Sequence, residues 1–204
     1  AVFDEASFFV DHRLLVRETP FPGISLIPSN KTLAELNTPR PEMGGMTQYA
    51  IRELLEAQEE YDIVLLDCPP NLYQCSWNGM IAADYVLIPV PPEDFGTQGL
   101  RAVHQAIDQA RRLNTRLRRL GHLVTRYDKR LLIHRSYEER LRGLYRELVL
   151  DTTIPEASAY KVSLACRQPV QFYSPKSPAA PILRALAEEM LTRAERREGK
   201  RSVG

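Results

Sequence analysis

Residues 61–70 read YDIVLLDCPP, and this stretch determines the class of fold that the sequence predicts. Four apolar residues, 63–66, run without a polar break and stop at Asp67. Such a run, bounded by turn-forming residues, is typical of a strand buried on both faces in a parallel sheet. Pro69 and Pro70 end the strand, since proline donates no ladder hydrogen bond. Asp67 then lies at the carboxyl edge of the sheet, where open α/β folds bind ligands, although a merely solvated aspartate gives the same pattern.

Strand and helix patterns alternate along the rest of the chain. Apolar residues at helical spacing predict helices over 32–36, 47–60, 73–83, 93–113, 132–148, 160–166 and 181–197. Short apolar runs predict further strands over 24–27, 85–90, 120–125 and 149–154. This alternation favours an α/β fold with a mainly parallel sheet and helices on both faces. The predicted strands end at one shared edge, at Asp67, Pro91, Thr125 and Pro155.

Composition and charge narrow the class of protein. The chain has 204 residues, 44% hydrophobic and 26% charged, which is ordinary for a soluble domain. No apolar run is long enough to span a membrane, and the three cysteines lack metal or disulfide spacing, so we expect reduced thiols in a cytoplasmic protein. Residues 1–100 hold 5 Lys+Arg and 15 Asp+Glu, whereas residues 101–204 hold 22 and 11. A basic half of this kind favours a polyanion partner, although solvated arginines on helix faces explain part of the excess.

Several longer motifs carry a more specific signal. YDIVLLDCPPN at 61–71 is followed by WNGMIAADYVLIPVPPEDFGTQGL at 77–100, and ISLIPSNKTLAEL stands at 24–36. LVTRYDKR at 123–130 and TTIPEASAYKVSLACRQPVQFYSPKSPAA at 152–180 continue the series in the same order. Together they resemble the ParA family of partition ATPases, the deviant Walker group that includes MinD, over residues 20–192.

The resemblance implies a fold and a set of binding residues. It implies a single, incomplete P-loop NTPase-like domain over residues 1–204, whereas the charged composition of residues 193–204 predicts a disordered tail. It places Asp67 beside a Mg²⁺ ion, through a water molecule, as the aspartate of a Walker B strand. It places Thr125 and Pro155 near the adenine of ATP, where the alternatives are an ordinary strand residue and a strand stop. Asn78 matches a family asparagine, for which capping or packing is an equally good interpretation.

One part of the family pattern is absent from the sequence. No GxxxxGK[ST] motif occurs, so the phosphate-binding loop and the strand before it are missing. Without backbone amides and lysine around the phosphates, phosphoryl transfer loses most of its electrostatic stabilisation. We therefore expect that this chain alone does not hydrolyse ATP. The start at Ala1 instead of Met favours a missing upstream segment over a degenerate family member.

The resemblance also implies binding of double-stranded DNA without sequence preference, through basic residues near the last strands and helices. The matching candidates are Arg126, Lys129, Arg130, Arg135, Lys161 and Arg167. Such contacts neutralise phosphates, so binding weakens steeply with salt. Solvated cations at a helix end are the alternative. Glu156 replaces a basic residue that the family often has, which weakens the case for DNA.

These expectations combine into one functional hypothesis and two alternatives. The complete protein is predicted to bind ATP and Mg²⁺, to form a homodimer, to bind the nucleoid DNA, and to release it when a ParB-type partner stimulates hydrolysis. A nucleotide-independent DNA-binding or regulatory module is the first alternative. A MinD-like membrane-cycling ATPase is the weaker one, because the tail after Leu191 has almost no bulky apolar residue and predicts no membrane contact.

Overall fold

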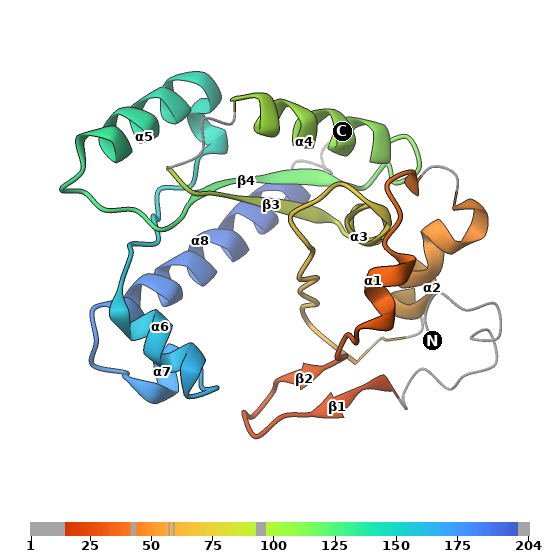
Figure 1. Ribbon diagram of the computed structural model, residues 1–204, viewed down its shortest axis with the longest axis horizontal. Coiled ribbons are helices and arrows are strands. Elements are labelled where there is room, and N and C mark those ends of the chain that lie inside the picture. Colours follow the sequence, from red (N-terminus) through yellow and green to blue (C-terminus); the bar gives the residue numbers. More distant parts are fainter. Residues whose placement is uncertain (1–14, 42–43, 57, 59, 93–96, 200–204) are drawn as a thin grey trace. The chain divides into compact units, whose positions relative to one another are not determined.

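The computed structural model describes residues 15–41, 44–56, 58, 60–92 and 97–199 (Figure 1). The chain divides into two compact units, which are described separately. The first unit comprises Ala1–Asp84 and Leu100–Leu117, and the second comprises Tyr85–Gly99 and Arg118–Gly204. The helix α4 (Thr97–Ala110) contributes to both. The single domain expected over residues 1–204 stays a prediction.

The second unit is built on two parallel strands. β3 (Tyr85–Val90) pairs with β4 (Arg118–Val124), with one register shift between Val86 and Leu87. α5 (Leu132–Tyr145) and α8 (Ala179–Gly199) lie on opposite sides of this pair (Figure 1). The parallel pairing and the helices on both sides confirm the α/β class that the sequence predicts.

Shorter helical segments complete the second unit. They are the 3₁₀ turn η5 (Arg146–Leu148), α6 (Ser158–Ala165) and α7 (Val170–Tyr173). The predicted tail is helical over its first part, because α8 continues to Gly199, and residues 200–204 lie outside the described residues. None of the helices in the described ranges combines the length and apolar character that crossing a membrane requires.

The segment 149–154 is predicted to be a strand, and the structure corrects this. It runs beside β4 in the parallel sense and forms only isolated ladder contacts. The amide of Leu150 donates to the carbonyl of His122 (2.9 Å), and the amide of Ile154 donates to that of Val124 (2.9 Å). Because the residues between these two bonds leave the ladder, the segment follows the sheet edge without becoming a regular strand.

Gly121 lets the chain at residues 148–150 approach β4 closely. Its φ is +157°, and a Cβ atom at this position would lie 2.5 Å from the carbonyl oxygen of Leu148 and 2.5 Å from Cδ1 of Leu150. Only glycine leaves room for this contact. Around it lies the apolar core of the unit, which includes Ile88, Val90, Leu120, Leu123, Val124, Leu141, Val149 and Leu150.

The first unit centres on the buried helix α3 (Gln74–Ala82), all of whose residues are buried. Against it lie η4 (Gly45–Tyr49) and α2 (Ala50–Glu56). Trp77 donates through Nε1 to Oε1 of Gln48 (3.1 Å), and Asn78 donates through Nδ2 to the carbonyl of Gln74 (3.1 Å). Within this unit Asn78 is therefore a buried residue that binds the backbone, which agrees with the capping or packing interpretation of the sequence.

Two strands expected in the first unit differ from the prediction. The run 63–66 is not a strand, and Ile63, Val64 and Leu65 are exposed. No strand among the described residues pairs with it, and an extended chain without ladder partners leaves its apolar side chains uncovered. The predicted strand 24–27 is reduced to β2 (Ser25–Leu26), which pairs in the antiparallel sense with β1 (Arg17–Glu18). The short helix α1 (Thr32–Leu36) agrees with the prediction.

Candidate functional site

The carboxyl end of β4 brings two of the predicted site residues into neighbouring segments. The amide of Thr125 donates to the carbonyl of Val90 (3.1 Å), so the chain still follows the sheet there. Tyr127 then pairs with Pro155 in the parallel sense. The amide of Tyr127 donates to Ile154 (3.0 Å) and its carbonyl accepts from Glu156 (3.1 Å). Thr125 and Pro155, both half-buried, therefore lie in neighbouring segments at one sheet edge, and their contact with adenine stays a prediction.

A pair of side chains on α8 fixes the segment that leads to Pro155. The Glu189 carboxylate accepts the amides of Asp151 (2.8 Å) and Thr152 (2.8 Å). Arg193 donates to the carbonyls of Glu147 (2.8 Å) and Val149 (2.9 Å) and pairs with Glu189 (2.9 Å). We call Glu189 and Arg193 the α8 staple.

The pKa of Glu189 reports the same bonds. Desolvation raises it, but the amides of Thr152 and Asp151 and the charge of Arg193 outweigh this, so the pKa lies below its usual value. The carboxylate is therefore held ionised by the chain it binds. Sequence reasoning missed the α8 staple, although a Glu–Arg pair four residues apart on a helix is a recognisable signal.

The loop 126–130 carries three of the predicted DNA-binding cations in a fixed conformation. Arg126 has a positive φ of 54°. The amide of Asp128 donates to Nδ1 of the buried His134 (2.9 Å). The Asp128 carboxylate accepts both the amide (2.9 Å) and the guanidinium (2.7 Å) of Arg130, and these bonds lower its pKa to about 2. The side chains of Arg126, Lys129 and Arg130 remain exposed.

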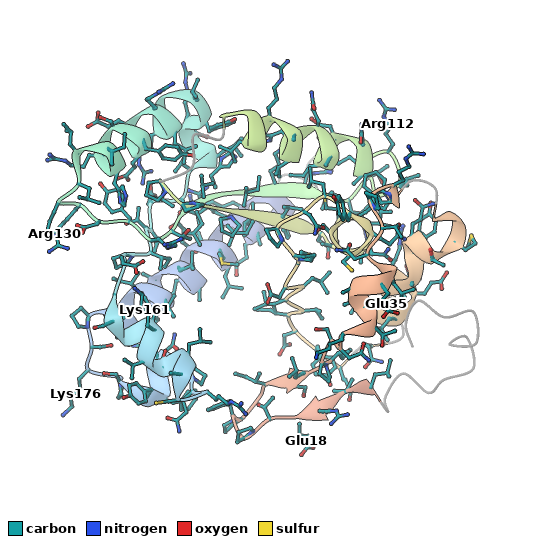
Figure 2. All side chains as sticks on the ribbon, in the orientation of Figure 1. Glu18, Glu35, Arg112, Arg130, Lys161 and Lys176 are labelled. Atoms are coloured by element: carbon teal, nitrogen blue, oxygen red, sulfur yellow. The ribbon has the colours of Figure 1, made fainter. Side chains whose placement is uncertain are left out.

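All six predicted DNA-binding cations belong to the second unit and are exposed. Figure 2 labels Arg130 and Lys161 on the same side of that unit. Glu156 forms ion pairs with Lys161 and with Arg126 (3.7 Å), and the hydrogen bond from Lys161, together with the two positive charges, lowers the pKa of Glu156. Lys129, Arg135 and Arg167 form no ion pair within the part of the chain that the structure describes. Glu156 thus holds Arg126 and Lys161 near each other but neutralises part of their charge.

Asp67 lies in the first unit and is exposed. The neighbouring Cys68 contacts Gly79, where an added Cβ would lie 2.8 Å from its Sγ atom. Desolvation, then the charges of Asp67 and Cys75, raise the pKa of Cys68, so the thiol stays protonated and a redox role has no support. Since Thr125 and Pro155 belong to the other unit, the joint site of the three residues stays a prediction.

The residues present fit the metal side of a Mg–nucleotide site but not its phosphate side. Among the described residues no three His, Cys, Asp or Glu side chains group as metal ligands. A lone exposed carboxylate fits a contact through water to Mg²⁺, whose remaining ligands are water and phosphate oxygens. The sequence supplies no phosphate-binding loop to hold those phosphates. Asp67 is therefore suited to the metal side alone.

Comparison with curated proteins gives consistent matches. Residues 9–119 match the family model described as AAA domain. The chromosome-partitioning ATPase Soj of Thermus thermophilus is 35% identical over 177 residues, which are 86% of this chain and 69% of Soj. The chromosome partitioning protein ParA of Caulobacter vibrioides is 31% identical, over 90% of this chain and 70% of ParA. The chain spans about half, 54%, of the length of the first curated relatives it matches, two uncharacterized proteins of Mycobacterium tuberculosis.

Solved structures agree with the fold. Cobyrinic acid a,c-diamide synthase of Mycobacterium smegmatis, with a bound ATP analogue and magnesium, superposes with a TM-score of 0.66 at 29% identity. That match covers 77% of this chain and 64% of the synthase. The ATP complex of a Cyanothece McdA variant superposes with a TM-score of 0.75 at 19% identity, over 93% of this chain and 73% of McdA. The second likeness concerns the fold alone.

Proposed function

Because the chain belongs to the ParA family of partition ATPases, we propose that the protein containing it binds double-stranded DNA without sequence preference and under the control of a nucleotide. The observation that supports this most is the group of exposed cations at the carboxyl end of β4, in the second unit. These cations neutralise DNA phosphates, which requires no base contacts.

The order of residues at the sheet edge supports the nucleotide control. Thr125 directly precedes Arg126, and Pro155 directly precedes Glu156, which pairs with Arg126 and Lys161. An adenine bound against Thr125 and Pro155 would therefore contact backbone that is one residue from the cation Arg126 and one residue from its partner Glu156. Asp67 would hold Mg²⁺ through water on the phosphate side, and the bound metal and nucleotide would supply the phosphoryl chemistry. A homodimer and a ParB-type partner complete the proposed cycle.

The test is DNA retention by the complete gene product with ATP, with ADP and without nucleotide, at several salt concentrations. We expect retention with ATP, release with ADP, and a steep loss of affinity as salt rises. Equal, salt-sensitive retention in all three conditions would exclude the nucleotide switch and favour a nucleotide-independent DNA-binding module. Co-sedimentation with liposomes in the presence of ATP would instead favour the membrane-cycling alternative.

Glu156→Gln is expected to strengthen DNA binding. The change removes the carboxylate that pairs with Arg126 and Lys161 and leaves both cations for phosphate. We expect several-fold tighter binding and a salt slope steeper by about 1, as for one additional phosphate contact. Fluorescence anisotropy on a duplex over a salt series measures both quantities.

Glu188→Gln is the matched control, because Glu188 is exposed on α8 and the substitution changes the net charge equally. A general electrostatic effect predicts the same result for both variants. Equal gains in affinity would therefore contradict the specific role of Glu156.

A further inference from the structure

A second basic surface lies in the first unit, where α4 ends. The sequence RRLNTRLRR at 111–119 places five arginines in nine residues. Arg111, Arg112 and Arg116 belong to the first unit, and we call residues 111–116 the arginine turn. Figure 2 labels Arg112, whose side chain extends away from the end of α4. This charge is unexpected in the first unit, because residues 1–100 carry 15 acidic side chains against 5 basic ones.

Asn114 holds the arginine turn in one conformation. This side chain is 1% exposed and donates through Nδ2 to the carbonyls of Met80 (3.1 Å) and Ala83 (2.7 Å). Its Oδ1 accepts the amide of Arg116 (3.2 Å), and Leu117 is fully buried directly after the turn. The backbone that carries the arginines is therefore fixed before any ligand arrives, which lowers the entropy cost of binding.

The neighbouring acids neutralise the arginine turn only in part. Arg111 lies 3.9 Å from Asp108 and Arg116 lies 3.6 Å from Asp84, and all four side chains are more than 40% exposed. Arg112 forms no ion pair within the ranges that the structure describes. A hollow of about 250 Å³ lies beside it, lined by Asp108, Arg111, Arg112 and Thr115. Such long, half-solvated ion pairs are weak and exchange readily for a phosphate.

Stabilisation of the helix end does not account for the whole group. Cations near a helix C-terminus interact favourably with the helix dipole, and this explains Arg111 and Arg112. The effect falls off within the last turn, so it does not extend to Arg116. A function that uses several positive charges along the chain explains the group better.

We propose that the arginine turn is a second contact for the phosphate backbone of duplex DNA; this inference rests on the DNA binding proposed above. Guanidinium groups bind phosphate oxygens through two parallel hydrogen bonds, which suits a rigid array of arginines. Apart from Leu113, which is 39% exposed, the turn offers no bulky apolar side chain. A protein interface needs an apolar centre, so nucleic acid is the better match.

The double substitution R111Q/R112Q in the complete protein tests the proposal. We expect DNA affinity to fall on the order of tenfold at low salt and the salt slope to decrease by about 2, one for each lost phosphate contact. The control R17Q/R101Q makes the same charge change at two exposed arginines of the first unit. Thermal unfolding of all variants checks that they are folded.

The outcomes separate this inference from the proposed function. A larger change of slope in R111Q/R112Q than in R17Q/R101Q supports the contact. Equal changes in both double variants show an effect of net charge and overturn it. If the unsubstituted protein binds DNA and the salt slope of R111Q/R112Q is unchanged, the DNA contact at the arginine turn is overturned and the proposed function stands. The turn is then a surface for an acidic protein. Absence of DNA binding by the unsubstituted protein overturns both proposals.

Discussion

Gly121→Ala is expected to lower the free energy of unfolding of the second unit by about 3 kcal/mol or more. The new Cβ atom would lie 2.5 Å from the carbonyl oxygen of Leu148, well inside van der Waals contact. This carbonyl cannot withdraw easily. Arg193 binds the backbone on either side of it, and the amide of Leu150 is bonded to His122. The φ of +157° adds strain for any side chain. Urea denaturation followed by circular dichroism measures the loss.

Gly143→Ala is the matched control for this prediction. Gly143 lies inside α5, is exposed, and an added Cβ would meet no atom within 4 Å. The same substitution should there stabilise the protein by about 0.5–1 kcal/mol, because alanine favours the helix. Similar losses in both variants would contradict the close contact at Gly121.

Asn114→Ala is expected to cost about 2–3 kcal/mol of stability. The change removes both donors to Met80 and Ala83 and leaves their carbonyls without these partners in a buried site. It also frees the amide of Arg116, which should loosen the arginine turn. Chemical denaturation measures the stability.

The control for Asn114→Ala is Gln109→Ala on α4, whose side chain is exposed and which should change stability by less than about 0.5 kcal/mol. Wild-type stability in Asn114→Ala would show that the buried amide does not anchor the turn. A salt slope for DNA that falls in Asn114→Ala, with the arginines all present, would add support for a preorganised surface.

The local pattern of apolar residues predicts some strands of the fold correctly and others wrongly. β3 has the predicted bounds, because an apolar run between Asp84 and Pro91 pairs with β4 inside the same unit. The run 63–66 has an equally strong pattern but forms no strand, since a strand needs a ladder partner, and the sequence of a segment does not contain its partner. Residues 149–154 fall between these cases, with ladder bonds at Leu150 and Ile154 only.

The candidate site shows the same division. The cations could be read from the sequence because charge and spacing are local properties. The shared pairing of Glu156 with Arg126 and Lys161 could not, because Arg126 is distant in sequence and the turn that brings it near has a left-handed residue at Arg126 itself. The anchoring role of Asn114 could not be predicted from the sequence either, since its hydrogen-bond partners lie 31 and 34 residues away.

The α8 staple determines how late in synthesis the second unit can complete its folding. Its bonds join residues 37 to 46 positions apart, and Glu189 and Arg193 come last in sequence. A ribosome releases the chain from its N-terminus, so β3, β4 and Pro155 emerge before the helix that fixes them. Until then the amides of Asp151 and Thr152 lack these acceptors, and the sheet edge stays open to chaperones. The second unit is therefore expected to reach its final form only after α8 has left the exit tunnel.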